Sequence, residues 1–154
     1  MKIKFKKLSP SAVAPSIMRT GDCGADLTAT SITECDMYIE YGTDLAVVIP
    51  PKHVGIITPR SSLSNYDLIL SNHVGVIDQN YRGEIRFRFK RTQISIAEFN
   101  SDGSVANYNA SKLYKVGDRI GQLLIIPLPA VEYEEVEELD ETNRGASGYG
   151  SSGV

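Results

Sequence analysis

The sequence predicts a small all-β protein, and three observations support that prediction. Short apolar or alternating runs recur along the chain, residues such as Gly, Pro, Asn and Asp separate them, and only one stretch favours a helix. Strands at this spacing are typical of a β-sandwich, a barrel or a jelly roll. A length of 154 residues suits a single domain with one sizeable core.

The N-terminal half contains three predicted strands and the predicted helix. Lysines alternate with Ile3 and Phe5, which is the pattern of an edge strand. The apolar runs at 45–49 and 54–57 each end close to proline, which cannot donate a ladder hydrogen bond and therefore stops a strand. Residues 61–70 are the one short helical stretch.

Two strands and a turn are predicted next. Residues 75–85 (GVIDQNYRGEI) hold a turn that Gly75 and Gly83 bracket between apolar strands, and we interpret them as a β-hairpin. Apolar and basic side chains then alternate over 85–90, which is the period of a half-buried strand. The apolar run at 123–126 predicts a last strand.

Three polar segments account for much of the remaining chain. Residues 100–112 are turn-rich and indicate an extended hairpin or a surface loop. Residues 132–141 carry seven acidic side chains, which indicates a solvated strand face or a linker. We expect a β domain at 1–141 and a flexible Gly-rich C-terminal arm at 142–154, because the arm cannot bury enough surface to fold alone.

Composition and charge exclude several classes of function. The net charge is −3 and no basic stripe runs along the chain, so non-specific nucleic-acid binding is not expected. No apolar stretch approaches about 18 residues, so no membrane span is expected. Cys23 and Cys35 are too few for a disulfide scaffold and indicate reduced thiols in a cytoplasmic protein. No cluster of His, Cys and carboxylates has metal-ligand spacing, so no protein metal site is expected.

The turn at 78–82 carries one candidate for catalysis. Asp78 would be a carboxylate on rigid strands beside the ring of Tyr81, and such a carboxylate can accept a proton from water. Backbone groups of the same hairpin can read the edge of a base. The simpler interpretation is a hairpin whose tip residues are merely polar.

Two further stretches can bind an anion. Arg60, Ser61 and Ser62 follow a strand at a predicted helix start, where hydroxyls either cap the helix or bind a phosphate together with the guanidinium. Gln122, in GDRIGQL, can donate its amide to a phosphate oxygen, although Asp118 and Arg119 beside it are more typical of a turn with an ion pair.

The tail RGASGYGSSG at 144–153 is most simply a disordered segment. It is no P-loop, because no Lys-Ser/Thr pair follows and no strand–helix frame surrounds it. Two side chains in this otherwise featureless tail favour a role in ligand binding. Tyr149 can stack on a base and Arg144 can clamp a terminal phosphate.

Taken in order, these stretches resemble the five motifs of the trimeric dUTPase family, and the resemblance spans residues 2–153. The matching segments are CGADLTA at 23–29, TPRSSLS at 58–64, NHVGVIDQNYRGEI from Asn72, GDRIGQL at 117–123 and RGASGYGSSG at 144–153. The resemblance implies a jelly-roll-like β-barrel of the dUTPase type (a β-clip). It also implies a homotrimer with active sites shared between subunits, over which the C-terminal arm closes.

The activity that the resemblance implies is hydrolysis of dUTP to dUMP and diphosphate, which limits uracil in DNA and supplies dUMP for dTMP synthesis. Asp78 would deprotonate the water that attacks the α-phosphorus, and Tyr81 would pack under the deoxyribose. Asp26 would support the hairpin and the sugar indirectly, through residues that contact the substrate. The other implied substrate-binding residues are Asn72, Gly75, Val76 and Ile77 for uracil, Arg60, Ser61, Ser62 and Gln122 for the phosphates, and Arg144, Tyr149, Gly150, Ser151 and Ser152 in the arm. Mg²⁺ would be held mainly by the triphosphate.

Some residues depart from the family pattern, and two alternative functions stay open. Asn80 stands where Asp is common, Tyr149 replaces the usual Phe, and the stretch after Ser62 is unusual. Residues 100–112 resemble an insertion. The first alternative is a dCTP deaminase, which shares Arg-Ser-Ser-Leu but lacks the arm and uses a Glu as proton shuttle. The second is a non-catalytic jelly-roll binding module.

Overall fold

The chain is built almost entirely of antiparallel strands, as predicted. The computed structural model describes residues 1–92, 96–99, 101–109 and 111–147, and within the strands at 96–99 and 105–109 it describes the backbone alone. The strands are β1 Phe5–Lys7, β2 Ala25–Thr28, β3 Ser31–Glu34, β4 Ile39–Gly42, β5 Leu45–Val47, β6 His53–Pro59, β7 Leu68–Leu70, β8 Gly75–Ile77, β9 Arg86–Arg91, β10 Ile96–Phe99, β11 Val105–Asn109 and β12 Arg119–Pro127.

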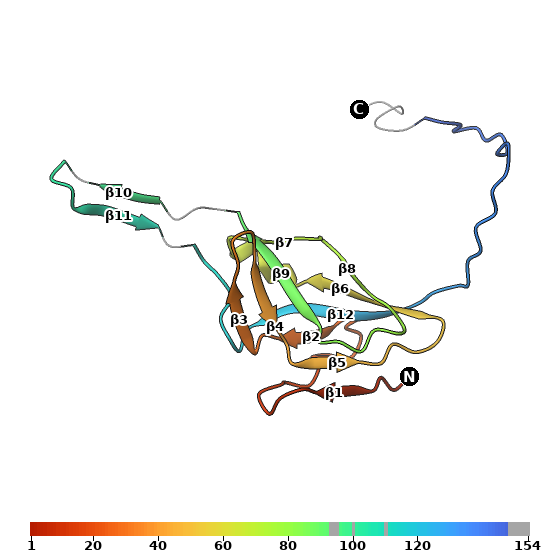
Figure 1. Ribbon diagram of the computed structural model, residues 1–154, viewed down its shortest axis with the longest axis horizontal. Coiled ribbons are helices and arrows are strands. Elements are labelled where there is room, and N and C mark those ends of the chain that lie inside the picture. Colours follow the sequence, from red (N-terminus) through yellow and green to blue (C-terminus); the bar gives the residue numbers. More distant parts are fainter. Residues whose placement is uncertain (93–95, 100, 110, 148–154) are drawn as a thin grey trace.

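Two four-stranded sheets form the body of the protein (Figure 1). Their strand orders are β2-β12-β6-β8 and β3-β4-β9-β7, while β1 pairs with β5 at the side as an edge pair. The core lies between the sheets, because β2, β6 and β12 contribute to one buried cluster with β4, β7 and β9. Phe87 and Phe89 are fully buried and Arg86 and Arg88 are exposed, which confirms the predicted alternation in β9.

The helix predicted at 61–70 is correct only in its first half. A 3-10 helix, η1, spans Ser61–Asn65, and Tyr66 then adopts an extended backbone conformation. Leu68 and Leu70 are buried and pair with β9, so tertiary packing overrides the local preference for a helix. No side chain caps the start of η1, and Arg60 before it is extended.

The β-hairpin predicted at 75–85 is wrong. β8 pairs with β6, while β9 pairs with β4 and β7, so the two strands belong to different sheets. Residues 78–85, here called the crossing segment, connect one sheet to the other. The sequence pattern correctly predicts two apolar strands on either side of residues 78–85. It does not predict their partners, because strand pairing depends on tertiary contacts that a local pattern does not contain.

The polar segments are resolved into a hairpin and an extended stretch. β10 and β11 form an antiparallel pair that projects from the body, so the hairpin expected at 100–112 occurs but begins earlier, at Ile96 (Figure 1). Residues 128–147 contain no strand, are exposed throughout and extend away from the sheets, so the acidic stretch is a linker and not a strand face. The division at residue 141 stays a prediction.

Two simpler findings concern membranes and thiols. In the described ranges, no helix has the length and apolar character that crossing a membrane requires. Cys23 and Cys35 are both free thiols.

Candidate active site

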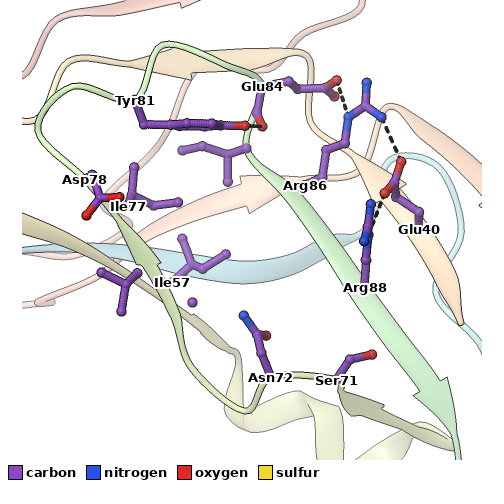
Figure 2. Close-up of a pocket in the computed structure, with 13 residues that line it drawn as sticks. Glu40, Ile57, Ser71, Asn72, Ile77, Asp78, Tyr81, Glu84, Arg86 and Arg88 are labelled. Atoms are coloured by element: carbon purple, nitrogen blue, oxygen red, sulfur yellow. Dashed lines mark hydrogen bonds and ion pairs between the residues drawn. The ribbon is translucent and has the colours of Figure 1, made fainter.

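A pocket of about 550 Å³ lies beside the crossing segment, on the outer side of β4 and β9 (Figure 2). Six of the predicted substrate or catalytic residues line it: Asn72, Gly75, Val76, Ile77, Asp78 and Tyr81. In Figure 2, Asp78 and Tyr81 lie across the pocket from Arg86, Arg88 and Glu40. The structure therefore brings the third motif together in one cavity.

Asp78 and Tyr81 are held by the backbone of the crossing segment. The Tyr81 amide donates to the Asp78 carbonyl at 3.1 Å, and the Tyr81 hydroxyl donates to the Glu84 carbonyl at 2.9 Å. Gly83 lets the Tyr81 ring lie against the backbone, because a Cβ at this position would collide with the ring in its present place. The Asp78 carboxylate is exposed and makes no hydrogen bond to any described residue, so its lone pairs are available to a ligand or to water.

The opposite wall of the pocket is a network of ion pairs on the outer faces of β4 and β9. Glu40 accepts from Arg86 Nη1 and Arg88 Nε, each at 2.8 Å, and Glu84 accepts from Arg86 Nε at 2.7 Å. Burial of Glu40 acts to raise the pKa of its carboxyl, but the hydrogen bonds from Arg88 and Arg86 outweigh it, so the pKa is lowered. None of these residues was predicted for the site, although the alternation in β9 places Arg86 and Arg88 on one face.

A second polar centre, here called the Asp26 cluster, lies on β2 and β12. Asp26 is only 3% exposed, and its Oδ1 accepts from Arg60 Nε at 2.9 Å and from Gln122 Nε2 at 3.1 Å. Its Oδ2 accepts from Arg119 Nη1 at 3.0 Å. A buried carboxylate needs such partners. Two guanidiniums against one carboxylate leave this cluster with a net positive charge, which suits an anionic ligand.

Arg119 is the residue of this cluster that the sequence analysis did not select. The expected turn ion pair between Asp118 and Arg119 is absent, because Asp118 accepts from the Lys115 amide at 2.7 Å and Arg119 reaches Asp26. The register shift in β12 between Arg119 and Gly121 accompanies this placement. A bulge of this kind leaves no clear signal in a single sequence.

Ser61 and Ser62 lie next to the Asp26 cluster. Arg60 Nη1 donates to Ser62 Oγ at 3.4 Å, and the Ser61 carbonyl accepts from Ser64 Oγ at 3.0 Å. The five-residue η1 is too short for a helix N-terminus to form an anion site by itself. Any affinity for phosphate in this region therefore depends on Arg60 and the hydroxyls.

Asp78 and the Asp26 cluster lie toward opposite ends of β6 in one chain. Ile77 pairs with Gly55, so Asp78 lies near the start of β6, whereas Arg60 follows its end. Asp78 lies opposite Val54 in this register, and six steps of roughly 3.3 Å from Val54 to Arg60 separate the two by about 20 Å along the strand. Arg60, Ser61, Ser62 and Gln122 accordingly do not line the pocket.

Arg144, the C-terminal candidate that lies within the described residues, is not brought to either centre. Arg144 is exposed, and its Nε donates to the Ser147 carbonyl at 3.1 Å within the extended stretch. Tyr149, Gly150, Ser151 and Ser152 lie outside the described residues. Their roles stay predictions.

The fold and its two centres define a class of small all-β proteins with a carboxylate-bearing pocket and a separate guanidinium cluster. A family model described as dUTPase matches residues 11–153. The chain therefore belongs to the dUTPase family.

Relatives and solved structures agree with this assignment. The deoxyuridine 5'-triphosphate nucleotidohydrolase of Rhodococcus erythropolis is 36% identical and covers 99% of this chain and 87% of its own length. A variant dUTPase of Staphylococcus bacteriophage 80alpha, solved with dUpNHpp, has a TM-score of 0.79 and 31% identity, with 99% of both chains covered. A variant dUTPase from phage phi11 of S. aureus, described as coordinating a structural Mg(II) ion, has a TM-score of 0.70 and 28% identity, with 92% of this chain and 100% of that chain covered.

Proposed function

We propose that this protein hydrolyses dUTP to dUMP and diphosphate. The observation that carries the proposal is the pocket, which gathers Asp78, Tyr81, Asn72 and the backbone of β8 around one cavity. The complex of a similar dUTPase with dUpNHpp supports a nucleotide as the ligand.

In the proposed reaction, Asp78 accepts a proton from a water molecule whose oxygen attacks the α-phosphorus. The new bond joins that oxygen to the α-phosphorus, and the bond from the α-phosphorus to the bridging oxygen breaks, so diphosphate leaves. The carboxylate of Asp78 suits this role, because it is exposed and makes no hydrogen bond to any residue that the structure describes. A general base of this kind contributes roughly 10²–10⁴-fold to the rate.

The edge of β8 supports recognition of the base. β8 is the last strand of its sheet and pairs only with β6, so its other edge presents backbone donors and acceptors to the pocket. The backbone of Gly75, Val76 and Ile77 and the amide of Asn72 would read uracil. The ring of Tyr81 would pack under the deoxyribose and exclude a 2′-hydroxyl.

The phosphates would bind at the Asp26 cluster. Arg60 and Gln122 are oriented by their bonds to Asp26, and Ser61 and Ser62 lie beside them. Asp26 would thus support the site without contacting the substrate. In the arm, Tyr149 would stack on the base while Arg144, Gly150, Ser151 and Ser152 cover the γ-phosphate.

The separation of the two centres supports a site assembled from several subunits, which in the family that the sequence resembles is a homotrimer. One dUTP molecule cannot place its α-phosphorus at Asp78 and its outer phosphates at Arg60 of the same chain if these are about 20 Å apart along β6. A neighbouring chain can supply the second centre. The cytoplasmic location expected from the cysteines remains a prediction.

Mg²⁺ would enter with the triphosphate, whose oxygens and bound waters serve as ligands. Both carboxylate oxygens of Asp26 already accept hydrogen bonds from Arg60, Arg119 and Gln122. Within the described ranges, no three His, Cys, Asp or Glu side chains converge as metal ligands. The ion would neutralise phosphate charge and fix one triphosphate conformation.

The experiment that tests the function uses four substrates. The protein is incubated with dUTP, dCTP, dTTP and UTP in the presence of Mg²⁺, and diphosphate and ammonia are assayed separately. Diphosphate from dUTP alone is expected. Ammonia from dCTP would instead support the deaminase alternative. The structure disfavours that alternative, because Glu40 and Glu84, the glutamates of the pocket, are tied to arginines and cannot readily shuttle protons.

Deleting residues 142–154 tests the arm. Because 128–147 are exposed and make no strand with the body, the truncated protein should fold and assemble like the full chain. Its kcat/KM for dUTP should fall on the order of 10²-fold, since the covering groups are lost. Full activity of the truncated protein would show that the arm does not take part.

A further inference from the structure

We propose that Glu84 is a positioning residue for the nucleotide sugar. Its carboxylate anchors the crossing segment to the turn between β4 and β5, and its main-chain carbonyl holds the hydroxyl of Tyr81. The proposal rests on the proposed function, in which Tyr81 packs under the deoxyribose.

The carboxylate of Glu84 makes three hydrogen bonds and is largely buried, with 12% of the side chain exposed. Its Oε1 accepts from the Thr43 amide at 3.0 Å and from the Asp44 amide at 2.9 Å. Its Oε2 accepts from Arg86 Nε at 2.7 Å. Charge-assisted bonds to backbone amides are stronger than neutral ones, so this side chain ties the crossing segment to a fixed turn.

Thr43 and Ile85 strengthen the attachment of the crossing segment to the β4–β5 turn. The buried hydroxyl of Thr43 donates to the Ile85 carbonyl at 2.7 Å, and the Ile85 amide donates to the Leu45 carbonyl at 2.8 Å. The end of the crossing segment is therefore bonded to the β4–β5 turn through both a side chain and the backbone. This fixes the Glu84 carbonyl in space.

That carbonyl is the partner of Tyr81. The Tyr81 ring is 44% exposed, so packing alone does not hold it, and the 2.9 Å bond from its hydroxyl is its specific polar restraint. The Tyr81 amide in turn closes the turn that begins at Asp78. A continuous set of hydrogen bonds thus links the β4–β5 turn to the sugar-packing ring and to the proposed base.

Removing the anchor should impair discrimination at the sugar. In Glu84→Ala, kcat/KM for dUTP should fall on the order of 10²-fold, because small misplacements of reacting groups have effects of this size. The ratio of kcat/KM for dUTP to that for UTP should fall about tenfold, since a mobile Tyr81 excludes a 2′-hydroxyl less well. Glu84→Gln keeps one acceptor oxygen for the two amides and should lie between Glu84→Ala and the wild type.

A double-mutant cycle with Tyr81→Phe tests whether Glu84 acts through Tyr81. Tyr81→Phe keeps the ring and removes the hydroxyl, so it should lower the dUTP-to-UTP ratio by itself. The two substitutions should then be less than additive, because both break the same connection. Glu34→Gln is the control, since it removes an ion pair to Arg91 in the same sheet at a residue that does not line the pocket, and it should leave the ratio unchanged.

The outcomes separate this proposal from the proposed function. A wild-type protein that does not hydrolyse dUTP contradicts the function itself. A wild-type dUTP-to-UTP ratio in folded Glu84→Ala, or full additivity with Tyr81→Phe, overturns the role of Glu84. If Glu84→Ala does not fold, Glu84→Gln and Tyr81→Phe decide, and unchanged ratios in both would overturn the proposal.

Discussion

At the scale of single residues, three carboxylate side chains have different environments. Asp78 is exposed and unbonded among the described residues, Asp26 is buried and fully bonded, and Glu84 is half-buried and bonded to backbone amides. Only the first can take a proton from water without losing a structural partner. Asp78 is therefore the proposed base because of its environment, and not because of its residue type.

Asp78→Asn tests that assignment. The substitution keeps the shape and removes the basic oxygen, so kcat should fall by roughly 10²–10⁴-fold while affinity for dUTP changes little. Turnover by quenched-flow assay and binding by titration calorimetry measure the two effects. Asp36→Asn, at an exposed turn between β3 and β4, is the matched control. Near-normal turnover in Asp78→Asn would place the base elsewhere.

Glu40 gives a pH dependence whose sign can be worked out. The arginines lower its pKa in the folded protein below the ordinary value of 4.5. Its contribution to the free energy of unfolding is therefore present above about pH 4.5 and is lost as pH falls through the lowered value. Wild type should be more stable than Glu40→Gln at about pH 7, and the difference should shrink at about pH 3. Urea unfolding at both pH values measures it, and a difference that grows in acid contradicts the assignment.

At the scale of elements, the sequence predicts strands better than it predicts their partners. Alternation in 85–90 predicted the buried faces of Phe87 and Phe89 because that signal is local. The predicted pairing of β8 with β9 is wrong, because strand pairing depends on contacts between residues distant in sequence. The candidate site shows the same limit. The third motif was predicted as a unit, whereas Arg119 and Glu84 depend on a register shift and on a turn some 40 residues away.

Gly121 tests how closely β12 packs against the opposite sheet. A Cβ at this position would collide with the Phe87 ring and lie 2.9 Å from the Thr58 carbonyl oxygen. Gly121→Ala should therefore lower the free energy of unfolding by about 1–3 kcal/mol, which is typical of overpacking. Adding Phe87→Leu removes the ring, so the double variant should lose less stability than the sum of the single changes. Chemical denaturation measures all three variants, and strict additivity would show that the ring is not the obstacle.

At the scale of the whole molecule, the distance between the pocket and the Asp26 cluster predicts how activity is divided among subunits. Asp78 and the Asp26 cluster are each contained within one chain, but they lie toward opposite ends of β6. Asp78→Asn damages only the pocket, and Arg60→Gln damages only the cluster while keeping a donor for Asp26. Each variant alone should be nearly inactive, for the reason that every site then lacks one centre.

Mixed trimers of these two variants should recover activity. If the pocket comes from one subunit and the cluster from the next around the ring, every trimer that contains both variants has two intact centres at about one third of its sites. Co-expression with different affinity tags isolates the mixed trimers, and their kcat per site should approach that fraction of the wild-type value. The two variants purified separately and combined just before the assay are the control. Mixed trimers that stay as inactive as either variant would show that each chain builds its own site, since only a site contained in one chain gains nothing from an intact neighbour.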